Sequence, residues 1–157
     1  MWSFRKPIKY KNTTKLRANS FGFYALNGNS VINFKDNSKK EAVCEFLMEI
    51  ISKNLGKRII IILDNFSSHR AKDTIEFAKN IGIELVFLPP YSPDLNPIEY
   101  IWKSIKRLVS KTFIKDVEHL KKIIREGFQD FSSKTSFAKK WIENFLSDEN
   151  KSEMLCS

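Results

Sequence analysis

The chain has 157 residues, the size of one domain, and 42% of them are hydrophobic, as in an ordinary folded protein. Its 27 Lys and Arg residues outnumber 18 Asp and Glu residues, so the formal net charge is +9. This excess favours a polyanionic partner, nucleic acid ahead of a membrane surface. Cys44 and Cys156 form neither a metal-binding spacing nor a disulfide framework, and the aliphatic run at residues 59–63 is far too short to cross a membrane. We therefore expect a cytoplasmic protein with reduced thiols.

The first part of the chain predicts an arm, a hairpin and a helix. Residues 1–18 are basic and poorly periodic, which indicates an extended basic arm. In residues 20–34, aromatic and β-branched residues flank an Asn-Gly-Asn turn, which predicts a β-hairpin. Residues 38–55 have apolar side chains at helical spacing, and Ser38 could cap that helix.

The middle of the chain predicts a βαβ unit. Residues 58–64 (RIIIILD) are too short and too rich in isoleucine for a helix and are typical of a strand buried on both faces. A helix over residues 70–80 and a strand over 83–89 follow, a spacing that predicts two parallel strands in one sheet. Three further helices are expected, at about residues 97–111, 116–131 and 134–146, in a single domain without internal repeats.

Asp64 stands where the buried strand meets its loop. Ligands of open α/β sheets gather at the carboxyl ends of strands, so an acid there is well placed for chemistry. The alternative is structural, since Asp followed by Asn also opens turns and caps helices. A nucleotide-hydrolase site is excluded because the sequence has no Gly-rich phosphate loop ending in Gly-Lys-Ser/Thr.

Glu99 also has two interpretations. Asn96 suits a helix N-cap, Pro97 suits the first turn, and Glu99 lies three residues after the cap, much as in a capping box. A capping carboxylate can still bind a metal ion. Two carboxylates 4 Å apart would repel by about 4 kcal/mol at an effective dielectric near 20. A site that collects Asp64 and Glu99 therefore favours divalent cations such as Mg²⁺ or Mn²⁺, and a pair of these suits phosphodiester cleavage.

Two stretches resemble a known family. The sequences IIIILDNFSSH, from residue 59, and GIELVFLPPYSPDLNPIEYIWKSIKR, from residue 82, are similar to the catalytic domain of DDE transposases, in the bacterial and archaeal insertion-sequence branch related to mariner elements. Between Asp64 and Glu99 lie 34 residues, the spacing of that branch's second and third catalytic acids. The resemblance extends from about Trp2 to about residue 135. It implies a ribonuclease H-like α/β fold, in which helices cover both faces of a mixed five-stranded sheet.

The resemblance also implies roles for individual residues. Asp64 and Glu99 would be catalytic and would bind Mg²⁺ or Mn²⁺ in a two-metal site for DNA cleavage and strand transfer. Asn65 and His69 match positions near that site, and His69 would either contact the DNA backbone or make a hydrogen bond at a helix start. Lys103, Lys106 and Arg107 extend the Glu99 helix as expected DNA contacts. The implied partners are transposon ends and target DNA, and a prokaryotic member would associate with the nucleoid.

The chain also departs from the family pattern. The family's first catalytic Asp lies on the first, central strand, upstream of a Trp that Trp2 matches, and no acidic residue precedes Asp36 here. We therefore expect that the central strand and its acid are missing, through truncation or a split reading frame, and that the chain alone is inactive. A second copy or the missing N-terminal fragment are further possible partners. The alternatives are a DNA-binding remnant that does not cut, and an interaction domain without a role on DNA.

Overall fold

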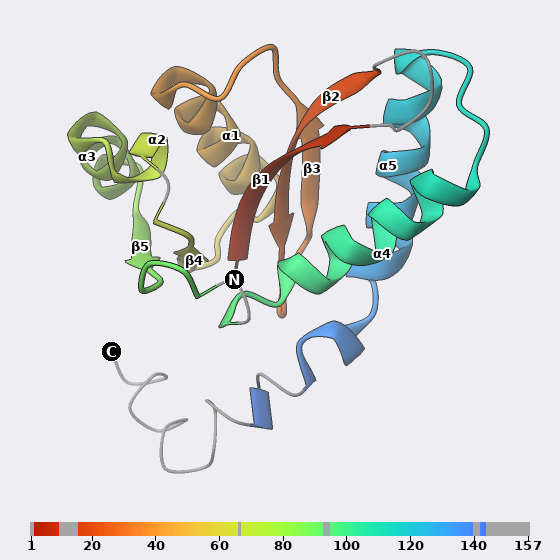
Figure 1. The fold of residues 1–157 in the computed structure, drawn as a ribbon. Helices are drawn as coiled ribbons and strands as arrows, with labels where there is room; N and C mark the ends of the chain where they lie inside the picture. The colour runs from red at the N-terminus through yellow and green to blue at the C-terminus, as the bar shows by residue number, and fades with distance from the viewer. Residues whose placement is uncertain (1, 10–15, 66, 93–94, 140–141, 144–157) are drawn as a thin grey trace.

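The sheet is the centre of the molecule. The structure, a computed structural model, describes residues 2–9, 16–65, 67–92, 95–139 and 142–143. It contains one mixed five-stranded sheet in the order β3-β2-β1-β4-β5 (Figure 1). The strands are β1 (Trp2–Lys9), β2 (Arg17–Tyr24), β3 (Val31–Phe34), β4 (Ile59–Leu63) and β5 (Ile83–Phe87).

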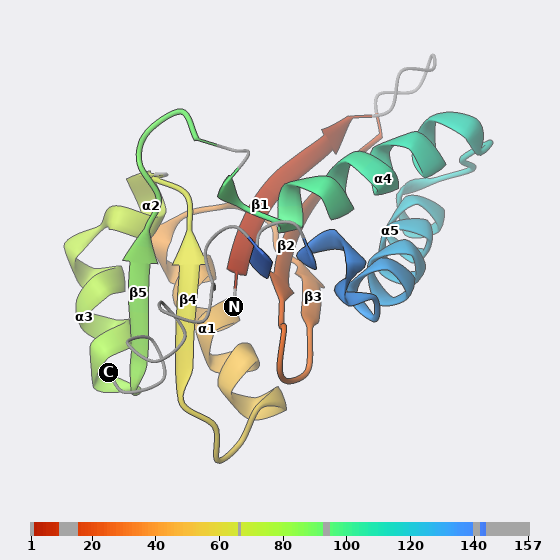
Figure 2. The same ribbon diagram turned by 90° about the horizontal axis from the view of Figure 1, so that it is seen from below.

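Helices cover both faces of this sheet. They are α1 (Lys40–Lys53), α2 (Ser67–Arg70), α3 (Lys72–Asn80), α4 (Ile98–Lys111), α5 (Val117–Ser132) and the 3₁₀ turn η2 (Thr135–Phe137). Helices α1 and α3 lie on one face and α4 and α5 on the other (Figures 1 and 2). This is the predicted ribonuclease H-like arrangement.

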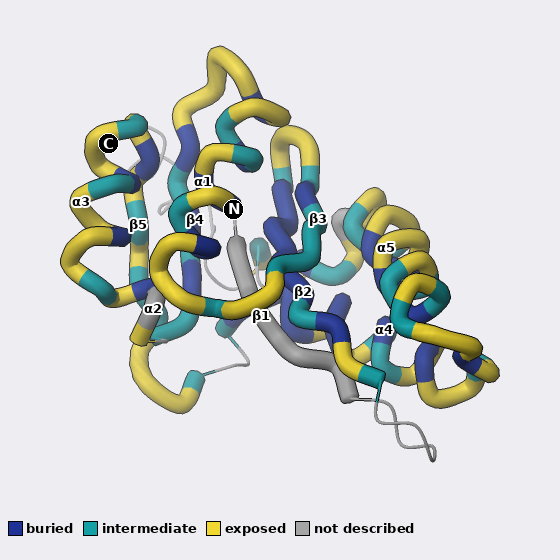
Figure 3. The backbone as a smooth tube through the Cα atoms, turned by 90° about the horizontal axis from the view of Figure 1, so that it is seen from above, coloured by how far each residue is buried: buried dark blue, intermediate teal, exposed yellow. Residues whose placement is uncertain are grey.

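Alternating side chains of β2 divide the interior into two cores. Phe21 and Phe23 pack with α1 and α3, whereas Ala18 and Tyr24 pack with α4 and α5. Successive residues of a strand point to opposite faces, so one strand serves both cores. Figure 3 shows the result: the buried segments follow the strands and the inner sides of the helices.

The βαβ unit forms as predicted. Strands β4 and β5 are parallel, in register from Ile59↔Ile83 to Leu63↔Phe87. The amide of Leu88 donates to the carbonyl oxygen of Leu63 at 2.8 Å, which extends the pairing by one step. Both strands therefore end at the same edge of the sheet.

The prediction that the central strand is missing is wrong in this structure. Strand β1 pairs antiparallel with β2 from Trp2↔Tyr24 to Lys9↔Arg17, and parallel with β4 at Trp2↔Ile62 and Ser3↔Leu63. Without it, β2 and β4 would each present an unpaired row of backbone donors and acceptors. Most of the expected basic arm of residues 1–18 is thus in the sheet, and residues 10–15 lie outside the described part of the chain.

The other predicted elements agree with the structure except at some ends. The hairpin is β2 and β3, and α1 begins at Lys40 with Lys39, not Ser38, at its N-cap position. The predicted helix 134–146 is only the turn η2 with helical backbone at residues 139 and 142–143, and its other residues beyond 139 lie outside the described ranges. The Tyr24 hydroxyl, whose pKa burial raises, donates to the Lys134 carbonyl oxygen at 2.6 Å and holds this segment to the sheet.

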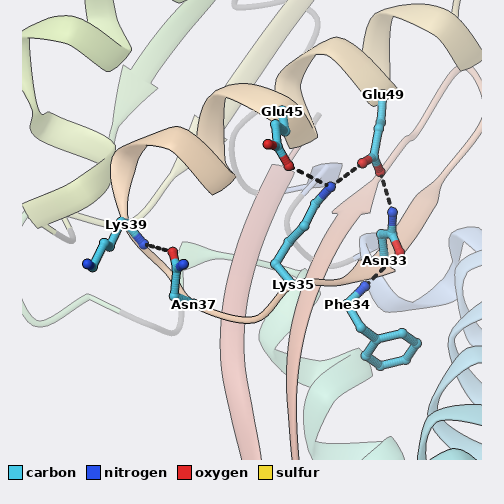
Figure 4. A network of polar contacts seen from close by, with 7 residues as sticks. All are labelled: Asn33, Phe34, Lys35, Asn37, Lys39, Glu45 and Glu49. Atoms are coloured by element: carbon cyan, nitrogen blue, oxygen red, sulfur yellow. Dashed lines mark hydrogen bonds and ion pairs between the residues drawn. The ribbon is translucent and has the colours of Figure 1, made fainter.

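A polar network joins the edge strand β3 to α1 (Figure 4). Lys35 contacts Glu49 and lies 3.3 Å from Glu45, while Asn33 Nδ2 donates to Glu49 Oε2 at 2.8 Å. Burial lowers the pKa of Lys35, but its hydrogen bonds and attraction to Glu49 and Glu45 outweigh that effect and raise the pKa above its ordinary value. Lys35 therefore stays charged at neutral pH and neutralises these acids, so its charge does not belong to the exposed basic surface.

Gly22 of β2 lies under the aromatic core. A Cβ atom there would be 2.7 Å from Trp102 Cζ2 and 3.1 Å from Phe128 Cε2. We expect Gly22→Ala to lower the free energy of unfolding by about 1–3 kcal/mol, measured in urea, because both rings would have to move. Gly127→Ala is the control: its Cβ would meet the flexible end of Leu108 at 3.3 Å, and Ala favours a helix by about 1 kcal/mol. An equal decrease in the free energy of unfolding of both variants would contradict the close packing at Gly22.

Candidate active site at the ends of β4 and β5

A cavity of about 200 Å³ lies where β4 and β5 end. Asp64 and Asn65 follow β4, and Asn96 and Glu99 belong to the start of α4. The remaining lining residues follow β5: Leu88, Pro89, Tyr91 and Ser92. The cavity is therefore at the carboxyl edge of the parallel strands, where the sequence places it.

The structure brings Asp64 and Glu99 together at this cavity, as the sequence predicts. The Asp64 side chain is 37% exposed, whereas Glu99 is only 8% exposed. Glu99 is fixed by its helix, because Ile98, Ile101 and Trp102 beside it are fully buried in the α4/α5 core. The Asp64 carboxylate is thus partly open to solvent, whereas Glu99 is buried and its helix is fixed by the α4/α5 core.

His69 supports Asp64 from within the protein. It belongs to the short helix α2, is 2% exposed, and its Nδ1 lies 2.7 Å from Asp64 Oδ1. A side chain covered to this extent does not reach a DNA backbone, so the structure does not support the DNA contact considered for His69. The contact that the structure shows is with Asp64, the candidate catalytic acid, and the hydrogen bond at a helix start stays a prediction.

Asn96 does not cap α4 through its side chain, contrary to the sequence prediction. Pro97 occupies the N-cap position without a side-chain capping bond, and the Glu99 amide donates to the main-chain oxygen of Asn96 at 3.0 Å. Asn96 is 1% exposed, and its Nδ2 and Oδ1 have no hydrogen-bond partner among the described residues. Sequence reasoning missed it as a site residue because Asn before Pro is typical of a cap.

Tyr91 is the second lining residue that sequence reasoning missed. Its side chain is fully exposed, and among the described residues it is the only non-glycine with a positive φ, 59°. Such backbone costs roughly 1–3 kcal/mol and persists where the surroundings impose it. The signal in the sequence was the turn PPYSPD, of which residues 93 and 94 lie outside the described part of the chain.

The basic residues of α4 extend from the cavity along the helix. Glu99, Lys103 and Lys106 follow i, i+4, i+7 spacing and share one side of α4. Lys103 and Arg107 are exposed and Lys106 is half-buried, while Lys103 Nζ lies 5.3 Å from the Tyr100 ring centroid. Their positions allow contact with a partner laid across the cavity, but their binding to DNA stays a prediction.

The donors at the cavity fit a hard divalent cation only in part. Carboxylate and carboxamide oxygens are ligands of Mg²⁺ and Mn²⁺. Within the described ranges, however, no group of three or more His, Cys, Asp or Glu side chains could hold a metal ion. On the central strand, Ser3 pairs with Leu63, the residue before Asp64, and neither Ser3 nor Phe4 is acidic. The described site thus has two carboxylates.

Comparison with known proteins establishes the family. The family model described as DDE superfamily endonuclease matches residues 5–121, well over half of the chain. The chain belongs to this family. Among the described residues, no helix is both long enough and apolar enough to span a membrane.

The relatives found by sequence are transposases and an uncharacterized protein. The Tcb2 transposase of Caenorhabditis briggsae is 34% identical over 55 residues, which is 35% of this chain and 20% of that protein. The uncharacterized protein y4pE/y4sA of Sinorhizobium fredii (strain NBRC 101917 / NGR234) is 35% identical over 82 residues, 51% of this chain and 58% of that one. The matched part is therefore less than two thirds of either relative.

A solved structure supports the fold. The mariner Mos1 paired end complex with Mg superposes with a TM-score of 0.74 at 17% identity, covering 90% of this chain and 52% of that chain. At this identity the likeness concerns the fold alone, and it confirms the ribonuclease H-like class of this DDE transposase domain.

The contact between His69 and Asp64 leads to a prediction. We expect His69→Ala to weaken Mn²⁺ binding by about 10–100-fold, because a carboxylate ligand loses the partner that orients it. Mn²⁺ affinity would be measured by electron paramagnetic resonance of the free ion. His119→Ala is the matched control, since His119 is on α5 and accepts a hydrogen bond from the Lys115 amide, away from the cavity lining. Equal affinities in the two variants would show that His69 does not position Asp64.

Proposed function

We propose that this chain is the DNA-processing domain of a transposase, with transposon ends and target DNA as its substrates. Its reaction class is phosphodiester cleavage and strand transfer supported by Mg²⁺ or Mn²⁺. The observation that supports this proposal most strongly is the meeting of Asp64 and Glu99 at one cavity. The family match over residues 5–121 supports the same proposal independently.

The residues at the cavity have separate roles in this proposal. Asp64 and Glu99 bind the cations, and His69 orients the more exposed of the two carboxylates. Divalent cations bound there would activate the attacking water or 3′-hydroxyl and stabilise the departing oxygen. The buried face of α4 keeps Glu99 in place, so that the ligands need little rearrangement.

The substrate is held by charge. Lys103, Lys106 and Arg107 extend from the cavity on α4, and the chain as a whole has a net charge of +9. Positive side chains beside the phosphate backbone release condensed counterions, which provides affinity without sequence recognition. Mos1 transposase, whose fold is similar, has been solved as a paired-end complex with left transposon end, which favours DNA as the partner here as well.

The second candidate function is DNA binding without cleavage: on its own, the chain would bind DNA but not cut it. Two carboxylates meet at the described site, and strand β1 contains no acidic residue. We infer that a pair of cations needs an acidic ligand in addition to Asp64 and Glu99. A further acidic ligand would then come from outside the described site, either from another copy or from the upstream part of a transposase. Without it, the chain acts as a non-catalytic DNA-binding protein.

Cutting is tested with supercoiled plasmid in Mg²⁺ and in Mn²⁺. We expect the chain to nick no faster than its Asp64→Ala variant, because two acids do not assemble the two-cation site. A companion reaction adds the upstream part of a related transposase, and there nicking should depend on Asp64. Robust nicking by the chain alone that is lost in both Asp64→Ala and Glu99→Ala would contradict the proposed inactivity.

DNA binding is tested by its salt dependence. We expect log K to fall with log salt, and the slope to decrease by roughly 0.9 for each phosphate contact removed in a Lys103→Ala, Lys106→Ala, Arg107→Ala triple variant. The control triple removes the same charge from exposed positions on the other face of the sheet: Lys53→Ala, Lys72→Ala and Lys79→Ala. Two results would contradict a DNA interface on α4. One is a log K of the unchanged chain that does not depend on salt, and the other is an equal slope for the two triple variants.

A further inference from the structure

Asn96 is the feature of the cavity that the fold itself does not explain. It lines the cavity together with Asp64 and Glu99 and is 1% exposed. Both polar atoms of its side chain are buried and have no hydrogen-bond partner among the described residues. Buried polar groups are nearly always paired, and a buried group left unpaired destabilises the protein.

Asn54 is a second buried asparagine, and all of its polar side-chain atoms make hydrogen bonds within the protein. Asn54 is 3% exposed. Its Nδ2 donates to the carbonyl oxygens of Asn29 and Ile50, each at 3.0 Å, and its Oδ1 accepts from the Asn29 amide at 2.8 Å. Asn54 therefore ties the β2–β3 turn to the end of α1. Asn96 has no comparable role, because even the start of α4 does not use its side chain.

The surroundings of Asn96 indicate what would satisfy it. Two of its neighbours at the cavity are carboxylates, so the occupant favoured by charge is a cation. A carboxamide oxygen is a neutral, hard donor that suits Mg²⁺ and Mn²⁺. It also adds a ligand to Asp64 and Glu99 without a third negative charge to repel them. The absence of a third acidic ligand within the described part of the chain makes such a neutral donor more important.

We propose that the Asn96 carboxamide oxygen is the third protein ligand of a divalent cation that Asp64 and Glu99 bind. The inference deepens the proposed function and rests on it. Asn96, Asp64 and Glu99 then form a site for one cation. The chain would bind one Mn²⁺ at this site even if it does not cut DNA. The helix start that contains Asn96 and Glu99 supplies two ligands from one rigid segment.

The test measures Mn²⁺ binding by electron paramagnetic resonance, with thermal unfolding in the presence and absence of Mn²⁺ as a second readout. We expect Asn96→Ala to raise the Kd for Mn²⁺ at least about tenfold and to lose the Mn²⁺-dependent rise in Tm. Asn96→Asp should instead bind Mn²⁺ more tightly than the unchanged chain, with a lower Tm in metal-free buffer, because three carboxylates then repel each other.

Asn54→Ala is the matched control for burial. It should lower Tm through its lost hydrogen bonds and leave the Kd for Mn²⁺ within about twofold. An unchanged Kd in Asn96→Ala, while Asp64→Ala abolishes binding, would overturn the role of Asn96 and leave the proposed function standing. A chain that binds no Mn²⁺ at millimolar concentration would overturn both this inference and the cation site of the proposed function.

Discussion

The parallel pairing of β4 with β5 is the constraint on which the site depends. Backbone hydrogen bonds hold the two strands in register to Leu63↔Phe87, and the Leu88–Leu63 bond extends the pairing to the loop. Asp64 therefore leaves the sheet beside the segment that leads to α4. That helix buries Ile98, Ile101 and Trp102, which leaves Glu99 at the cavity. Two residues with 34 others between them in the chain meet because two separate cores fix both ends of this connection.

Much of this arrangement could be predicted from local patterns. The isoleucine run, the helix after it and the apolar run before PPYSPD have the lengths and spacing of a βαβ unit, and β4, α3 and β5 follow them closely. The apolar face of α4 was visible from helical spacing, so the side from which Glu99 projects was predictable as well. These features depend on short-range periodicity, which a sequence displays directly.

The remaining features depend on contacts between distant segments. Trp2–Lys9 has the composition of a basic arm, yet it is a strand because β2 and β4 both have backbone groups to pair. The sequence predicts for His69 a DNA contact or a hydrogen bond at a helix start, but the packing of α2 buries it against Asp64. Asn96 reads as a helix cap, and only the structure shows that its side chain is unused by the helix. In each case a residue's neighbours, and not its type, decide its role.

The central claim is that Asp64 and Glu99 share one cation, and paramagnetic broadening by Mn²⁺ in ¹⁵N-resolved NMR spectra tests it most directly. The account predicts that sub-stoichiometric Mn²⁺ broadens the amide signals around residue 64 and around residue 99 together. It also predicts that both effects disappear in Asp64→Ala. Broadening around only one of the two acids, or at an unrelated part of the chain, would contradict the shared site.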